Sequence, residues 1–214
     1  MKQFGGWWFT DEEAHFPEWL AKKNQSIDGR LAYQGHKLLA SVEQCKSFEC
    51  AVDVGGHIGT FSYYLAQRFE TVHAFEPVPA FRECFNRNVE ALNVTLHACA
   101  LGASEGRVGM HIVPSDTGGT YVSGSGDIEM RTLDSFELQN VSYLKIDCEG
   151  YELAVLQGAV ETLKRCRPVC MVEQKMHKML PNFGIRGTPA VDFLVAMGAR
   201  HIRELGGDHI LKFD

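Results

Sequence analysis

Short apolar segments alternate with amphipathic segments of helical length along most of this chain of 214 residues. The apolar runs predict strands at residues 50–54, 71–75, 94–98, 143–147 and 169–173. The helical spacing of apolar residues predicts helices at 35–45, 60–69, 79–92, 149–163 and 189–197. Because parallel strands need long crossover connections, this alternation favours a mostly parallel sheet covered by helices on both faces.

The end of the chain predicts a β-hairpin. Residues 199–205 and 210–213 are strand-like and flank a Gly-Gly-Asp turn, so one antiparallel strand should lie at or near a sheet edge. Residues 107–113 and 128–133 predict two further strands around a loop rich in glycine and serine. Since the chain contains no internal repeat and no low-complexity linker, we expect a single α/β fold with a doubly wound, Rossmann-like sheet.

The first 34 residues differ in composition from the rest of the chain. Large aromatic side chains crowd together there on both sides of an acidic stretch at residues 11–13. They are Phe4, Trp7, Trp8, Phe9, Phe16 and Trp19. Because aromatic side chains bury large apolar areas, we interpret residues 1–34 as an aromatic-rich extension or lid packed against a main domain of residues 35–214.

A glycine-rich turn follows the first predicted strand, in the segment AVDVGGHIGTF. Its glycines, which allow a close approach of a ligand to the backbone, are Gly55, Gly56 and Gly59. The dinucleotide-binding pattern G-x-G-x-x-G is incomplete, because Val54 stands where its first glycine is required. The loop instead reads D-x-G-x-x-x-G from Asp53, and a carboxylate there would repel a pyrophosphate and suit a cationic amino-acid group.

The next two strands supply complementary groups at their ends. Glu76, followed by Pro77, ends the second strand, where a carboxylate can accept hydrogen bonds from both hydroxyls of a ribose. Ala100 and Leu101 end the third strand and predict an apolar wall for an adenine ring. Because ligands of such sheets lie beyond the carboxyl ends of the strands, these features together predict a site for a nucleoside joined to an amino acid.

Motifs of a known family occur in several segments between about residues 50 and 173. These segments are AVDVGGHIGTFS (51–62), HAFEPVPAF (73–81), CALGASEG (99–106), RTLDSF (131–136) and YLKIDCEGYELAVLQGA (143–159). They resemble the FkbM family of S-adenosylmethionine-dependent methyltransferases. The resemblance implies the seven-stranded class I methyltransferase fold, whose final strand is antiparallel, and S-adenosylmethionine as the cofactor.

The same resemblance implies roles for particular residues. The loop 53–59 would contact the cofactor, Glu76 its ribose, and Ala100 and Leu101 its adenine. Gly56-His57 departs from the family, which more often resembles Ala-Asn at this position. Tyr33 and Gln34, just before the first predicted helix of the main domain, could close over the methionine carboxylate.

A hydroxyl group that accepts a methyl group must also lose its proton, which calls for a general base or a metal ion. Asp147 and Glu173 end adjacent predicted strands and are the first candidates, with His57 in the glycine loop as a third and with Asp147 also a possible cofactor contact. Glu149 is close to Asp147 in the chain, and both residues could instead cap the helix that follows. Further possible bases are His111 and His177.

Carboxylates on adjacent strands would also suit a magnesium ion. We expect no metal to be required, and if a divalent metal such as Mg²⁺ is present we expect Asp147 and Glu173 to hold it.

The composition argues against several classes of partner. The formal net charge is −6, from 21 Lys and Arg against 27 Asp and Glu, and no basic run is present, so a nucleic-acid partner is disfavoured. No apolar stretch is long enough to span a membrane, and the seven scattered cysteines contain no C-x-x-C pair, so we expect a cytoplasmic protein.

We therefore expect O-methylation of a small molecule or a carbohydrate. The alternatives are a nicotinamide-dependent oxidoreductase, which Val54 disfavours, and a cofactor-binding module without turnover.

Overall fold

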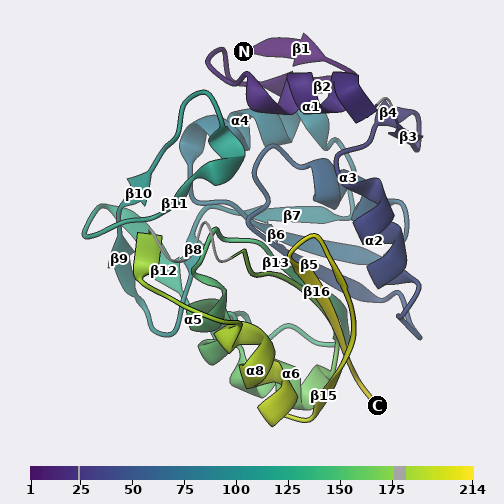
Figure 1. Ribbon diagram of the computed structural model, residues 1–214, viewed down its shortest axis with the longest axis vertical. Helices are drawn as coiled ribbons and strands as arrows, with labels where there is room; N and C mark the ends of the chain where they lie inside the picture. Colours follow the sequence, from purple (N-terminus) through teal and green to yellow (C-terminus); the bar gives the residue numbers. More distant parts are fainter. Residues whose placement is uncertain (24, 176–181) are drawn as a thin grey trace.

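The centre of the molecule is a seven-stranded sheet in the order β15-β16-β14-β13-β5-β6-β7, seen in a computed structural model that describes residues 1–23, 25–175 and 182–214 (Figure 1). Its strands are β5 (Cys50–Val54), β6 (Thr71–Phe75), β7 (Val94–His97), β13 (Val141–Ile146), β14 (Val169–Glu173), β15 (Ala199–Leu205) and β16 (Asp208–Phe213). The pairs from β14 to β7 are all parallel, and β16 runs antiparallel to both of its neighbours. The expected doubly wound α/β fold is confirmed.

The terminal hairpin also forms as expected, with one addition to the prediction. The last strand, β16, lies between β14 and β15, so β15 rather than β16 occupies the edge of the sheet. The chain enters the sheet at β5 and first builds outward through β6 and β7, then returns to the other side of β5 with β13. The order reverses between β5 and β13, and ligands of open α/β sheets bind outside the carboxyl ends of the strands at such a point.

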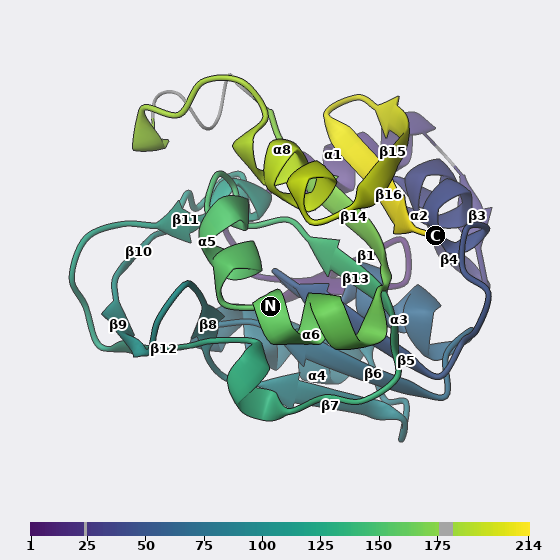
Figure 2. The ribbon, with the colours of Figure 1, turned by 90° about the horizontal axis from the view of Figure 1, so that it is seen from below.

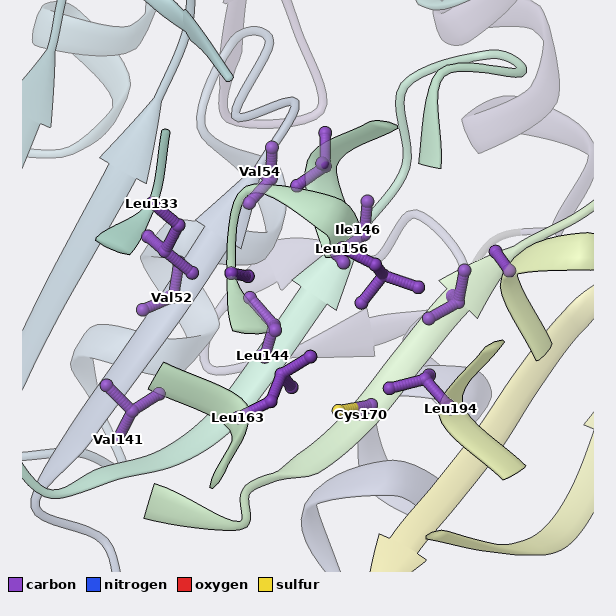
Figure 3. Packing of buried hydrophobic residues seen from close by; sticks show 14 of the residues in the cluster. Val52, Val54, Leu133, Val141, Leu144, Ile146, Leu156, Leu163, Cys170 and Leu194 are labelled. Atoms are coloured by element: carbon purple, nitrogen blue, oxygen red, sulfur yellow. The ribbon is translucent and has the colours of Figure 1, made fainter. Parts of the chain in front are cut away.

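Helices cover both faces of the sheet (Figures 1 and 2). They are α2 (Gly35–Val42), α3 (Thr60–Ala66), α4 (Pro79–Asn88), α5 (Glu152–Gln157), α6 (Val160–Cys166) and α8 (Pro189–Ala196). Alternate residues of a strand point to opposite faces, and the core divides accordingly. Val52 and Leu144 pack with residues of α5, α6 and α8 (Figure 3), whereas Ala51 and Tyr143 pack with residues of α2 and α3. No helix in the described part of the chain has the length and apolar content needed to cross a bilayer.

One predicted helix is divided in two. The sequence predicts a continuous helix over 149–163, whereas the structure has α5 and α6 separated at Gly158. A Cβ atom at Gly158 would lie 2.0 Å from the carbonyl oxygen of Gly102, so the chain makes a close backbone contact at this point. Asp134 caps the second helix, because its carboxylate accepts hydrogen bonds from the backbone N–H groups of Glu161 and Thr162.

The N-terminal segment packs into the main core. It contains β1 (Lys2–Phe4), β2 (Trp7–Phe9), α1 (His15–Lys23), β3 (Ser26–Ile27) and β4 (Arg30–Leu31). Trp7 and Phe16 are buried in one hydrophobic cluster with Phe61 and Tyr64 of α3. Trp7, Phe9 and Phe16 thus complete the hydrophobic layer on the α3 face, while a domain boundary at residue 34 stays a prediction.

An insertion between β7 and β13 forms a second accessory region. Its elements are β8 (Ala100–Leu101), β9 (Gly106–Val108), β10 (Met110–His111), a 3₁₀ turn (Thr117–Gly119), β11 (Tyr121–Val122) and β12 (Ile128–Arg131). The backbone N–H groups of Ala14 and His15 both donate to the carbonyl oxygen of Ser115, which joins this insertion to the N-terminal segment. The two accessory regions therefore meet above the carboxyl ends of the central strands.

Candidate active site

A cavity of about 460 Å³ lies at the carboxyl ends of β5, β6, β13 and β14. Its floor contains strand ends and the glycine loop, and its walls come from α1 and from the insertion around the 3₁₀ turn. This volume falls within the range of about 300–1,000 Å³ that is typical of small-molecule sites. The cavity also lies where the order of the strands reverses, so fold and cavity indicate the same ligand site.

The glycine loop brings two strand ends close together. Gly55 has a φ of +78°, and a Cβ atom there would lie 2.0 Å from the carbonyl oxygen of Asp147. Only glycine allows both this conformation and this approach. Gly55 and Gly56 line the cavity, whereas Gly59 lies away from the wall, where its lack of a side chain leaves room for Val89 and Phe85 of the neighbouring segment.

Asp53 lies behind the cavity rather than on its wall. Its side chain is completely buried, with Oδ1 2.9 Å from Lys145 Nζ and Oδ2 accepting a hydrogen bond from Ser62 Oγ at 2.7 Å. The expected contact between Asp53 and a cofactor therefore stays a prediction, because the residue that reaches the cavity is its partner Lys145.

Lys145 is a site residue that the sequence prediction missed. Burial disfavours its charge, but the carboxylates of Asp53 and Asp147 outweigh burial and hold the pKa of Lys145 above its usual value. Its Nζ also donates a hydrogen bond to the carbonyl oxygen of Gly55 at 3.2 Å, so the lysine stabilises the backbone of the glycine loop. The signal available in the sequence was a lone lysine within an otherwise apolar strand.

Glu76 lies on the cavity wall beside Pro77 and is held firmly. One carboxylate oxygen accepts a hydrogen bond from the backbone N–H of His57 at 2.8 Å, and the other accepts one from Val78 at 2.7 Å. Burial nevertheless raises the pKa of Glu76 to about 7. Each oxygen retains a second lone pair, so the carboxylate can still accept hydrogen bonds from a ligand.

His57 also lines the cavity, with an imidazole ring held on three sides. The ring centroid lies 5.2 Å from that of Phe16 and 4.8 Å from that of Phe81, and Nε2 lies 2.7 Å from Thr117 Oγ1. Burial lowers the pKa of His57 to about 4. The ring is therefore neutral near pH 7, which makes it a weak base and a good hydrogen-bonding group.

Three carboxylates gather at the ends of β13 and β14. Asp147, Glu149 and Glu173 each place an oxygen within 4.8 Å of the others, as a divalent cation would require. Lys175 Nζ forms an ion pair with Glu173, so a protein cation already neutralises part of this cluster. The three carboxylates are thus oxygen ligands of the kind that a divalent cation binds, with Lys175 beside one of them.

Four more of the predicted site residues lie on the cavity wall, and one of the predicted bases does not. Tyr33, Gln34, Ala100 and Leu101 all line the cavity. Tyr33 stacks on Phe16 with ring centroids 4.0 Å apart, which fixes the aromatic part of the wall. His111 lies exposed on β10 and outside the cavity lining, and His177 lies outside the described residues.

A seven-stranded sheet of this order, with a ligand cavity at its switch point, is the architecture of class I methyltransferases. The model of the methyltransferase FkbM domain matches residues 53–184. The chain belongs to the FkbM methyltransferase family, which confirms the resemblance seen in its motifs and separates it from the nicotinamide-dependent oxidoreductases.

Two curated relatives support the same family. "Methyltransferase 1" of Beauveria bassiana is 28% identical over 141 residues, covering 50% of this chain and 57% of the relative. "Hexuronic acid methyltransferase AglP" of Haloferax volcanii is 28% identical over 132 residues, covering 58% of this chain and 55% of the relative. The chain thus spans just over half the length of these relatives.

Solved structures support the fold. The methyltransferase FkbM from Methylobacillus flagellatus superposes with a TM-score of 0.51 at 21% identity, covering 78% of this chain and 43% of that one. The precorrin-6y C5,15-methyltransferase from Geobacter metallireducens has a TM-score of 0.52 at 13% identity, covering 89% and 94%.

Proposed function

We propose that this methyltransferase uses S-adenosylmethionine to methylate a hydroxyl group of a small molecule or a carbohydrate. The observation that carries the proposal is the cavity at the ends of β5 and β6, which combines a glycine turn with a fixed carboxylate at Glu76. The hexuronic acid methyltransferase among the relatives favours a carbohydrate acceptor. O-methylation is proposed over N-methylation on this ground.

The residues around the cavity fit the cofactor. Glu76 offers oxygens to the ribose hydroxyls, while Pro77, Ala100 and Leu101 offer an apolar surface to adenine. The carboxylate cluster at the ends of β13 and β14 suits a ligand that carries positive charge. Tyr33 and Gln34, from the loop before α2, would close over the amino-acid end.

Bound S-adenosylmethionine supplies an activated methyl group on a sulfonium. Methyl transfer to a hydroxyl would form a C–O bond as the S–CH₃ bond broke, would leave S-adenosylhomocysteine, and would require a base in the cavity to take the hydroxyl proton. We assign Asp147 and Glu173 as the first candidates to take this proton, with His57 as a third, because all three line the cavity. The stacked rings of Phe16 and Tyr33 give the cavity an apolar wall, which would limit the access of water to the reactants.

We propose that no metal ion is required. A divalent ion, if bound, would be held by Asp147 and Glu173 together with Glu149, and would draw charge from the acceptor hydroxyl.

Calorimetry with S-adenosylhomocysteine tests the cofactor assignment through the variant Glu76→Gln. Losing a charged acceptor of ribose hydrogen bonds should cost about 1–3 kcal/mol, which is roughly a 5- to 150-fold weaker affinity. Glu161→Gln, an exposed carboxylate on α6, is the matched control and should bind as the wild type does. Unchanged affinity in a folded Glu76→Gln variant would remove the ribose assignment.

A methyl-transfer assay against hexoses and hexuronic acids, followed by release of S-adenosylhomocysteine, tests the acceptor class. Binding of the cofactor without release of product across the panel would favour a binding module instead. Tighter binding of a nicotinamide cofactor than of S-adenosylhomocysteine would overturn the proposal as a whole.

A further inference from the structure

A buried chain of hydrogen bonds connects the N-terminal segment with the glycine loop. Glu13 is completely buried, and its Oε2 accepts hydrogen bonds from both the backbone N–H and the hydroxyl of Thr117. Its Oε1 accepts a hydrogen bond from the backbone N–H of Phe16 at 2.9 Å. Thr117 Oγ1 in turn lies 2.7 Å from His57 Nε2. Three segments far apart in the sequence therefore meet through polar groups at one wall of the cavity.

The direction of each hydrogen bond follows from the groups present. A carboxylate only accepts hydrogen bonds, so the single hydroxyl proton of Thr117 is directed to Glu13. Thr117 Oγ1 can then meet His57 only as an acceptor, which requires a proton on His57 Nε2. A neutral imidazole carries one N–H, so Nδ1 of His57 holds the unshared electron pair.

That electron pair belongs to a ring on the cavity wall. Among the hydrogen bonds of the described residues, the His57 ring engages Nε2 with Thr117 and leaves Nδ1 unused, and the residue is only partly buried. His57 lines the cavity, and Phe16 and Phe81 limit the rotation of its ring. Nδ1 is thus a hydrogen-bond acceptor on a ring of restricted rotation at the cavity wall.

We propose that Glu13 and Thr117 are positioning residues that fix the Nε2–H tautomer of His57, so that Nδ1 accepts a hydrogen bond from a hydroxyl group of the bound ligand. The proposal rests on the proposed function, in which this cavity binds the cofactor and the acceptor. It assigns a role to residue 13, which lies outside the part of the chain that matches the family model. The ligand hydroxyl belongs either to the cofactor ribose or to the acceptor, and the experiment separates these two sources.

Nitrogen-15 NMR of the histidine rings in the ligand-free protein tests the tautomer directly. The signals of His57 are identified by their loss in His57→Gln. In the wild type we expect a protonated-type shift for Nε2 and an unprotonated-type shift for Nδ1 at neutral pH. A proton on Nδ1 would overturn the proposal, and this result would not depend on whether the chain transfers methyl groups.

Two substitutions at one position test the positioning role. Thr117→Val removes the hydroxyl and should let His57 move toward a mixture of both tautomers, whereas Thr117→Ser keeps the hydroxyl and should preserve the wild-type shifts. Glu13→Gln should disturb the tautomer as Thr117→Val does. The amide can donate a hydrogen bond to Thr117 Oγ1, and the Thr117 hydroxyl can then donate to His57 Nε2. An unchanged tautomer in Thr117→Val, in a protein that unfolds cooperatively, would show that the chain of hydrogen bonds does not set it.

Titration of the wild type distinguishes a hydroxyl of the cofactor ribose from a hydroxyl of the acceptor. A movement of the Nδ1 signal toward a hydrogen-bonded shift with S-adenosylhomocysteine alone identifies the ribose. A movement that requires the further addition of glucose, galactose or mannose identifies the acceptor. If the Nδ1 signal moves with neither probe, although calorimetry shows S-adenosylhomocysteine bound, recognition of a hydroxyl by His57 is refuted.

Discussion

At the residue scale, Glu76 both holds the backbone of the glycine loop and borders the ligand cavity. Its two oxygens hold the backbone N–H groups of His57 and Val78, and the same carboxylate borders the cavity. Burial favours the neutral acid, whereas ribose hydroxyls favour the carboxylate. Cofactor binding should therefore depend on pH in a range where an ordinary glutamate would be fully ionised.

We predict that the affinity for S-adenosylhomocysteine increases with pH between 6 and 8. Because burial raises the pKa of Glu76 to about 7, binding must first remove a proton at the lower pH. For one such proton the dissociation constant should be about tenfold larger at pH 6 than at pH 8. The free energy of unfolding should change in the opposite direction. Because the pKa of Glu76 is raised in the folded protein, its contribution to stability is lost as the pH rises toward 7.

Calorimetry at several pH values measures this dependence, with Glu76→Gln as the control that should lose it. His57 does not titrate in this range, because burial lowers its pKa to about 4. An equal pH dependence in the wild type and in Glu76→Gln would assign the proton to another group.

At the scale of elements, a buried ion pair joins β5 to β13. Asp53 and Lys145 face each other across the two parallel strands, and both side chains are almost completely buried. A buried pair of this kind contributes little relative to an apolar pair, but either partner is costly to leave alone. We infer that the ion pair favours the register of β5 and β13 in which these two charges meet.

We predict that Lys145→Met lowers the free energy of unfolding by about 3–5 kcal/mol, because the buried carboxylate of Asp53 loses its cation. The double variant Asp53→Asn/Lys145→Met should recover part of this loss, since the uncompensated charge is gone. Urea unfolding of the two single variants and the double variant measures the coupling. A double variant that loses the sum of both single effects would show that the two groups act independently.

At the scale of the whole molecule, the N-terminal segment is a structural part of the fold. Trp7 is completely buried and contacts Tyr63 and Tyr64 of α3 edge to face, with ring centroids 5.3 and 5.9 Å apart. Its indole N–H donates to the carbonyl oxygen of Leu31. A segment held in this way forms a fixed wall of the cavity.

We predict that Trp7→Ala destabilises the protein by about 3–5 kcal/mol, the usual cost of emptying a large aromatic site. Phe4→Ala is the matched control, because Phe4 belongs to the same segment but is 39% exposed. Thermal and urea unfolding of both variants measure the difference. If Trp7→Ala were as stable as Phe4→Ala, the segment would be a detachable lid rather than a part of the core.

Much of the fold is determined locally and could be predicted from the sequence. The bounds of β5, β6, β14 and β15 agree with the prediction, because each is a short strand-like run bounded by turn residues. The positions of Glu76 and Asp147 at strand ends follow from the same pattern. The carboxyl ends of parallel strands meet at one edge of a sheet, so the sequence alone predicted the edge at which the candidate cavity lies.

The partners of the buried charges were decided only by the tertiary structure. The sequence gives no sign that Asp53 meets Lys145 or that Glu13 reaches Thr117, since these partners are 92 and 104 residues apart. The break at Gly158 has the same origin, because it depends on the backbone of Gly102. Local pattern fixes which residues form strands and helices, whereas burial of a charge or a close backbone contact depends on which distant segment packs against it.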